Sequence, residues 1–351
     1  SDNIHVKYLY KESCMREIYI KENESGQRFD KFLKKYLSEA PGSFLYKMLR
    51  KKNIVLNGRK ATGSEKLKKG DQVKLFLADE TLEKFTGKQE TAHSKKKLPK
   101  IQMPVVYEDE DVVFYNKPAG LLSQKAKPSD VSVVEYLMEH LLETKALRQD
   151  DLKTFRPSIC NRLDRNTSGL ITAGKSLAGL QKLSELFKDR TLKKYYLCLV
   201  KGTIDKRAHI CGYLQKDKAT NQVRISKQAG ADAVPIETEY VPVAWNQEIT
   251  LLKVHLITGR THQIRAHLAW QGHPLLGDPK YGDPKWNRKW NGRMKTAQTR
   301  QMLHAYELVM PEMNKTLKKL SGRTFTAPVP EDFYKIIKET TWEHGTQEVL
   351  E

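Results

Sequence analysis

The first regular pattern of apolar and polar positions lies between residues 22 and 78. From Arg28 to Leu37 the apolar residues recur at the spacing of one helical face, which predicts an amphipathic helix. Pro41-Gly42 ends that pattern, and Ser43 is a candidate N-cap for a second helix.

The same stretch then changes to the period of a strand. Ile54–Leu56 and Val73–Leu77 predict strands, and Asn57-Gly58 is a dipeptide that a tight hairpin turn favours. We therefore expect a small α/β module over residues 22–78. The second helix and the segment after it carry a one-sided group of cations, which indicates either a phosphate-binding surface or a solvated face: Lys47, Arg50, Lys51, Lys52, Arg59 and Lys60.

Beyond this module the periodicity is first lost and then mixed. Residues 79–100 have little apolar content and end in lysines, so we expect a basic linker. In residues 101–340, strand-like runs such as Ile249–Leu256 are interspersed with helix-like runs without regular alternation. This predicts an α+β domain with a mixed, largely antiparallel sheet flanked by helices. Residues 1–21 are expected to form an N-terminal extension and residues 341–351 a C-terminal tail.

The charge of the chain narrows the class of its partners. Among 351 residues, Lys and Arg outnumber Asp and Glu by 62 to 42, which gives a formal net charge of +20. Such an excess favours polyanions, because each neutralised phosphate releases counterions. General solubility and an anionic membrane surface are the alternatives.

Neither a membrane span nor a disulfide framework is indicated. No run approaches the ~20 apolar residues that a span needs, and no signal-type segment opens the chain. The four cysteines, Cys14, Cys160, Cys198 and Cys211, form no C-x-x-C pair, so their spacing does not predict a zinc site. We expect a cytoplasmic protein without membrane association, and nothing in the sequence indicates a protein partner, which favours a monomer.

The densest group of polar residues is the segment from Asn161 to Leu170. Here Asp164 stands between Arg162 and Arg165, and two guanidinium groups favour the ionised carboxylate. An ionised carboxylate suits a nucleophile or a stabiliser of positive charge, and it does not suit a general acid. Spacing alone favours a structural alternative, in which Asp164 caps a helix or forms an ordinary ion pair.

A second polar segment runs from Thr258 to Leu268. Its two arginines and Gln263 offer donors suited to phosphate, ribose or carboxylate groups. His262 and His267 are five residues apart, which misses the i, i+4 spacing of a helical metal site. The chain also lacks G-x-S-x-G, P-loop and G-x-G-x-x-G motifs, so neither a metal nor a cofactor is indicated.

Together the two segments resemble the RluA-type pseudouridine synthases, the branch that includes RluC and RluD. The family signature His-Arg-Leu-Asp-Arg-x-Thr-Ser-Gly-Leu is matched apart from its first place, which is Asn161 here. Further shared runs follow in family order within residues 105–335: Asn116–Leu121, Lys194–Tyr196, Gly259–Leu268, Gly277-Asp278 and Leu303–Ala305. Residues 24–78 resemble the RNA-binding module named after ribosomal protein S-four, which RluC and RluD types also carry.

The resemblance implies an RNA pseudouridine synthase, an isomerase without a cofactor, acting on structured RNA and by family analogy on large-subunit ribosomal RNA. It places the catalytic aspartate at Asp164, the basic residue paired with it at Arg265, and the ring that stacks on the target uracil at Tyr196. Arg162 matches a residue that contacts the flipped nucleotide. The further RNA-binding candidates are Arg165, Lys47, Arg50, Lys51, Arg260, His262 and Gln263.

Three points leave alternatives open. Asn161 lacks the titratable ring of the family signature, so no proton role is expected there; it would also be a first sign of decay in a non-catalytic RNA-binding or ribosome-assembly factor. A nucleoside hydrolase or other glycosidase usually needs paired carboxylates, which these motifs lack. The Trp- and Arg-rich insertion 284–300 fits single-strand RNA contacts, although we favour a lid packed on its own domain.

Overall fold

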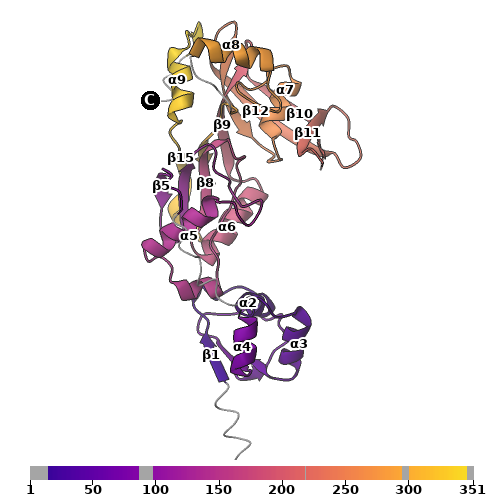
Figure 1. Ribbon diagram of the computed structural model, residues 1–351, viewed down its shortest axis with the longest axis vertical. Helices are drawn as coiled ribbons and strands as arrows, with labels where there is room; N and C mark the ends of the chain where they lie inside the picture. Colours follow the sequence, from indigo (N-terminus) through magenta and orange to yellow (C-terminus); the bar gives the residue numbers. More distant parts are fainter. Residues whose placement is uncertain (1–14, 87–97, 218, 295–299, 346–351) are drawn as a thin grey trace, which may run out of the picture. The chain divides into compact units, whose positions relative to one another are not determined.

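The computed structural model describes residues 15–86, 98–217, 219–294 and 300–345 (Figure 1). The chain divides into two compact units. The first contains the N-terminal residues up to Pro99, together with 138–157 and 176–178; the second contains 100–137, 158–175 and the residues from Gly179 onward. Among the described residues, no helix combines the length and the apolar character needed to cross a membrane.

The first unit pairs a small antiparallel sheet with helices. In chain order its elements are β1 (Met15–Tyr19), η1 (Glu22–Glu24), α2 (Phe29–Tyr36), α3 (Gly42–Arg50), β2 (Ile54–Leu56), β3 (Arg59–Lys60), β4 (Gln72–Phe76), α4 (Asp79–Phe85) and, after a long insertion of the second unit, η2 (Gln149–Lys153). The strands are ordered β1-β4-β2-β3. The two predicted helices and two predicted strands of this region are therefore confirmed, to within a residue or two at their ends.

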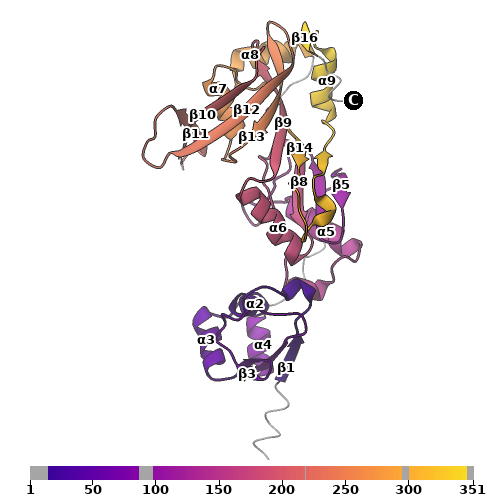
Figure 2. The same cartoon turned by 180° about the vertical axis from the view of Figure 1, so that it is seen from behind.

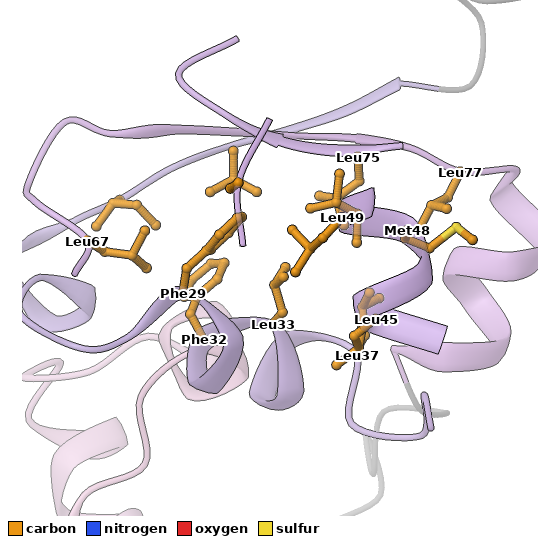
Figure 3. Packing of buried hydrophobic residues seen from close by; sticks show 14 of the residues in the cluster. Phe29, Phe32, Leu33, Leu37, Leu45, Met48, Leu49, Leu67, Leu75 and Leu77 are labelled. Carbon is orange, nitrogen blue, oxygen red and sulfur yellow. The ribbon is translucent and has the colours of Figure 1, made fainter. Parts of the chain in front are cut away.

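The core of this unit is formed by the apolar faces that the sequence pattern predicts. Phe29 and Leu33 of α2 are fully buried, and they belong to one cluster with Leu45 and Leu49 of α3 and Leu75 of β4 (Figure 3). Burial of this shared face explains why two helices of only eight and nine residues are stable, since isolated helices of that length are marginal in water.

Several expected boundaries in this region are wrong. Residues 79–85, assigned to the linker, form helix α4, because Leu82 and Phe85 pack on the core cluster; residues 87–97 lie outside the described part. The expected extension 1–21 contributes strand β1, which pairs with β4. Helix α3 starts at Gly42 with Pro41 as its N-cap, so Ser43 is not the cap.

The first unit also takes in residues 138–157, which the sequence analysis assigned to the catalytic domain. Here Lys21 donates a hydrogen bond to Asp151 at 2.8 Å, and the Thr154 hydroxyl donates one to Glu24. A division of the chain at residue 100 would therefore separate groups that contact each other.

The second unit is built on a twelve-stranded sheet. Its path is β11 (Gln222–Ser226), β10 (Ala208–Asp217), β12 (Val234–Trp245), β13 (Ile249–Leu256), β9 (Lys193–Lys201), β14 (Leu303–Val309), β8 (Ser168–Gly174), β6 (Val112–Lys117) and β5 (Val105–Glu108), with β7 (Ser158–Ile159), β15 (Thr324–Thr326) and β16 (His344–Gly345) attached at the side. Within the described residues, the strands of this sheet pair in antiparallel fashion except β14 with β8. The α+β class with a largely antiparallel sheet is confirmed.

Helices and short connecting turns cover this sheet. They are α5 (Val133–Glu143), whose second half is grouped with the first unit, α6 (Leu177–Lys188), α7 (Gln263–Trp270), α8 (Pro284–Met294), η3 (Lys318–Leu320) and α9 (Glu331–Glu339). Figure 2 shows α7 beside the strands β10 and β12. Helices α8 and α9 lie at the upper end of this unit in the same view. Strand β16 pairs with β12, so residues 341–345 belong to this fold, whereas the rest of the expected tail lies outside the described residues.

The insertion 284–300 forms helix α8, with residues 295–299 outside the described part. Trp286 and Trp290 are buried in a cluster with Phe333 and Ile336 of α9. Arg293 and Lys289 pair with Glu248. The tryptophans thus pack on their own domain, which agrees with the alternative favoured above.

Candidate active site

Asp164 lies on the loop that joins β7 to β8, and its side chain is 28% exposed. The sequence predicts that Arg162 and Arg165 accompany the carboxylate, but both arginines are exposed. The cation that contacts it is Arg265, whose Nη1 donates a hydrogen bond to Asp164 Oδ2 at 2.8 Å. The fold therefore brings together two groups that are 101 residues apart.

Arg265 is itself held by a second carboxylate. Its Nε and Nη2 donate to the two oxygens of Asp278 at 2.7 and 2.8 Å, which is the bidentate geometry that a guanidinium favours. Burial opposes the charge of Arg265, but Asp278 and Asp164 outweigh it and raise the pKa of the guanidinium. Burial likewise opposes the charge of Asp278, yet Arg265 lowers the pKa of its carboxyl.

Asp278 has further partners that fix it in place. The backbone N–H groups of Lys280 and Tyr281 donate to its Oδ1 at 2.8 and 3.1 Å, and its side chain has no exposed surface. A buried carboxylate with four hydrogen bonds is a rigid anchor. It sets the direction of Arg265, and with it the position of the donor that meets Asp164.

The start of α7 is fixed by Gln263. This buried side chain accepts hydrogen bonds from the Thr258 hydroxyl and Arg260 N, and it donates to Glu237 O and the Thr238 hydroxyl. Its amide is therefore used within the protein, and the expected contact of Gln263 with RNA stays a prediction. Arg260 by contrast is exposed.

His262 faces the catalytic candidate and lies away from the surface. Its Nε2 is 3.9 Å from Asp164 Oδ2, and its Nδ1 is 2.9 Å from the Tyr281 hydroxyl. Burial lowers the pKa of His262, while the charge of Asp164 acts in the opposite direction. His262 therefore belongs to the immediate surroundings of Asp164, a position that its place in the sequence did not predict.

Tyr196 reaches the same region from strand β9. It is buried in a cluster with Leu163 and Ala305. Leu163 directly precedes Asp164 in the sequence, and Ala305 lies opposite Tyr196 on the neighbouring strand β14. Burial raises the pKa of the Tyr196 phenol, and the negative charge of Asp164 acts in the same direction. The ring is thus uncharged and close enough to Asp164 to be affected by its charge.

The backbone of the Asp164 loop is held on both sides of the carboxylate. Ser123 Oγ donates to Leu163 O at 2.7 Å and accepts from Leu163 N at 2.9 Å. Lys117, which is fully buried, donates from Nζ to Arg165 O at 3.0 Å and to two further carbonyl oxygens. Burial lowers the pKa of Lys117 to about 7.

The far end of the loop is tied to the C-terminal part of the unit. Arg300 forms a two-bond ion pair with Asp332 at 2.6 and 2.8 Å and donates to Asn166 O at 3.2 Å. Gly169 allows β14 to lie against β8, because a Cβ at its positive φ would overlap the Ala305 carbonyl. With these contacts the loop is a rigid support for Asp164.

Asn161 takes part in this support. Its Oδ1 accepts from Thr172 N and the Thr172 hydroxyl at 2.8 and 3.0 Å, and its Nδ2 donates to Leu170 O at 3.1 Å. The side chain therefore links the start of the loop to β8. Both ends of its amide are used in these hydrogen bonds, so Asn161 has a structural role in this loop.

Some of these residues were not recognised from the sequence. Asp278 and Lys117 stand in runs shared with the family, but no role was assigned to either. Ser123 and Arg300 carried no signal, because their contacts with this loop are made to backbone atoms 40 and 134 residues away. Lys47, Arg50 and Lys51 are exposed on or just after α3, as expected for a contact surface.

The chain is similar to several known proteins. Residues 111–270 match the family model described as RNA pseudouridylate synthase. A relative from Vibrio vulnificus, called ribosomal large subunit pseudouridine synthase C, is 31% identical over 75% of this chain and 78% of its own. An uncharacterized RNA pseudouridine synthase of Mycoplasma genitalium is 32% identical over 84% of this chain and 88% of its own.

A solved structure, human RNA pseudouridylate synthase domain containing 4, shares the fold with a TM-score of 0.54 and 20% identity, covering 69% of this chain and 94% of that one. The chain belongs to the RNA pseudouridylate synthase family, within the branch of the RluA and RluC types. It is accordingly an isomerase that acts on RNA.

Proposed function

We propose that this enzyme converts uridine to pseudouridine in large-subunit ribosomal RNA, with Asp164 as the catalytic carboxylate. The observation that carries the proposal is the arrangement of Asp164, Arg265 and Asp278. A partly exposed carboxylate receives a hydrogen bond from a buried arginine whose direction is set by a second, fully buried carboxylate. Such a carboxylate is preorganised to act on a positively charged or electron-poor carbon.

The reaction moves the ribose from one atom of uracil to another. The bond between C1′ and N1 breaks, a bond between C1′ and C5 forms, N1 gains a proton and C5 releases one. No electrons are gained or lost, so the chemistry needs no oxidant. Asp164 serves in either of two routes: it adds to the nucleotide to form a covalent intermediate, or it assists the departure of uracil before the base rotates.

The target nucleotide must leave its helix before Asp164 can reach it. Extrusion costs a few kcal/mol and is least costly in loops and bulges. Tyr196 would stack on the freed uracil, and exposed Arg162 and Arg165 on either side of Asp164 would contact the flipped nucleotide and the neighbouring phosphates. Arg260 would add a further phosphate contact from the turn before α7.

The first unit would add affinity for folded RNA. Its exposed cations Lys47 and Arg50 lie on α3 and Lys51 directly follows it, and a cavity of about 490 Å³ lies beside them, lined by residues that include Tyr46, Arg50 and Lys60. This supports the resemblance to the module named after ribosomal protein S-four. We further propose that the enzyme acts as a monomer in the cytoplasm, and its scattered cysteines agree with a reducing compartment.

Release of tritium from RNA labelled at uridine C5 tests the proposal directly. We expect the full-length protein to release tritium from large-subunit ribosomal RNA, and the Asp164→Asn variant to release none while its RNA affinity changes less than about threefold. Appreciable turnover by a homogeneous Asp164→Asn preparation would refute the catalytic assignment. Release from transfer RNA alone would overturn the substrate and leave the chemistry intact.

A non-catalytic RNA-binding or ribosome-assembly factor remains the second candidate function, and Asn161 was the reason to consider it. The same assay separates the two, because a binding factor would hold RNA without releasing tritium. The intact contacts of Asp164, Arg265 and Tyr196 favour the enzyme.

A further inference from the structure

A group of metal-ligating side chains lies on strands β10 and β12, away from the Asp164 loop. His209 and Cys211 are two residues apart on β10, so they share one face, and the antiparallel register places Cys211 opposite Glu237 and His209 opposite Glu239. Ile210, between them, points into the cluster that contains Tyr196. The group is therefore on the face of the sheet opposite to that of Tyr196.

The three nearest potential ligand atoms are His209 Nε2, Cys211 Sγ and a carboxylate oxygen of Glu237, all within 4.8 Å of one another. Nε2 is 3.7 Å from Sγ and 2.6 Å from Glu237 Oε1. A tetrahedral zinc ion with bonds of about 2.0–2.3 Å separates its ligands by roughly 3.3–3.6 Å. The distance between the nitrogen and the sulfur is close to this spacing, and the carboxylate must move away from Nε2 by roughly 1 Å to make room for a metal.

The outer contacts of this group are those that a zinc-bound histidine requires. When Nε2 of His209 is a ligand, its Nδ1 carries the proton, and Nδ1 is 3.6 Å from Glu239. Glu239 is in turn 3.1 Å from His255 Nδ1, and the His255 ring stacks on Tyr195 at 4.8 Å between centroids. Glu239 is thus anchored close to Nδ1, and a small approach when metal binds would let it accept the Nδ1 proton of His209.

The space beside the ligands is large enough for a metal with an open position. His209, Cys211 and Glu237 all line a cavity of about 600 Å³. A fourth ligand can therefore be a water molecule, as in zinc sites with three protein ligands. Thiolate, imidazole and carboxylate together match zinc better than the hard cations, which prefer oxygen alone.

We propose that His209, Cys211 and Glu237 bind one zinc ion on the face of the sheet opposite to that of Tyr196, with Glu239 and His255 as its outer support. The site ties β10 to β12 and so stabilises a region of the sheet where β11 does not cover the edge of β10. It lies outside the residues assigned to catalysis, so it is independent of the proposed function.

The test uses full-length protein freed of metal by a chelator and titrated with Co²⁺, which reports a thiolate ligand by a charge-transfer band in the near ultraviolet. We expect one equivalent to bind with that band, Zn²⁺ to displace it, and zinc to raise the thermal unfolding midpoint. Cys211→Ser should lose the band and the rise in midpoint. His209→Ala should weaken binding by at least about tenfold, and Glu239→Gln by about tenfold through the outer contact.

Matched controls distinguish this site from other thiols. Cys160→Ser and Cys14→Ser should keep the band, and Cys211→Ser should release tritium from RNA at the wild-type rate. The proposal is wrong if wild-type protein shows no thiolate band, or if the band persists in Cys211→Ser. In either case the cluster would be an ordinary network of surface ion pairs.

Discussion

The buried carboxylate of Asp278 binds two nitrogens of Arg265, which leaves the third nitrogen, Nη1, directed at Asp164. The partly exposed ion pair of Arg265 with Asp164 therefore depends on a third residue that is fully buried. Two carboxylates thus share one guanidinium, and the buried one sets its direction.

Replacing Asp278 by Asn should reduce both stability and turnover. Breaking a buried ion pair costs about 3–5 kcal/mol, and the freed guanidinium would no longer hold its direction toward Asp164. We expect at least a tenfold loss of tritium release at a temperature where the variant is still folded, with RNA affinity nearly unchanged. Asp283→Asn is the control. It breaks the ion pair of Asp283 with Lys201, which is more exposed than the pair of Asp278 with Arg265, and it should cost about 1 kcal/mol or less. Wild-type turnover in Asp278→Asn would show that the orientation of Arg265 does not matter.

Replacing Asn161 by His, the residue of the family signature, should leave activity nearly unchanged. An imidazole supplies one donor and one acceptor, which can replace part of the bonding of Asn161 to Leu170 and Thr172. Asn161→Leu supplies neither and should cost about 1–3 kcal/mol in unfolding free energy. Activity and urea unfolding of the two variants are the measurements. A large loss in Asn161→His, or a new ionisation in its pH–rate profile, would mean that the site has adapted around Asn.

Stability should fall on mild acidification because of two buried histidines. Burial lowers the pKa of His267 and of His304 to about 4, whereas an unfolded histidine titrates near ~6.5. Between these values the unfolded chain binds more protons, so the unfolding free energy decreases as pH falls from about 6.5 to about 4. Each histidine contributes up to about 3 kcal/mol.

Urea unfolding across this pH range checks the prediction. His304→Gln should flatten the dependence, and His344→Gln, at an exposed position, should not. Neutral His304 also fits its contacts, since its two ring nitrogens lie 2.9 Å from the Ser168 hydroxyl and from Ala327 O. Equal slopes in wild type and His304→Gln would contradict the assignment.

The cations around α3 should contribute to RNA affinity through counterion release. Lys47→Glu with Arg50→Glu should weaken binding to structured RNA and make the dependence of log affinity on log salt shallower. The same charge change in Lys315→Glu with Lys318→Glu, two exposed residues of the second unit, is the matched control. Activity on a minimal stem-loop should suffer less than activity on large folded RNA. Identical salt slopes for the two double variants would mean that the α3 face is merely solvated.

Local patterns in the sequence determined the elements and the chemical class. The period of apolar residues predicted α2, α3 and strand β13, because burial of one face is a property of neighbours in the chain. The signature around Asp164 indicated the family, since its residues are contiguous in the chain. Helix α4 escaped prediction because only Leu82 and Phe85 anchor it, which is too few positions for a period to be visible.

Tertiary structure decided which charges meet. The sequence placed Arg162 and Arg165 beside Asp164, yet adjacent side chains of a loop diverge, and the contact is made by Arg265 from α7. Asp278, Lys117, Ser123 and Arg300 act on backbone or buried groups that are distant along the chain, so no spacing rule reveals them. The cluster of His209, Cys211 and Glu237 likewise joins residues that are distant along the chain, because the register between β10 and β12 places Cys211 opposite Glu237.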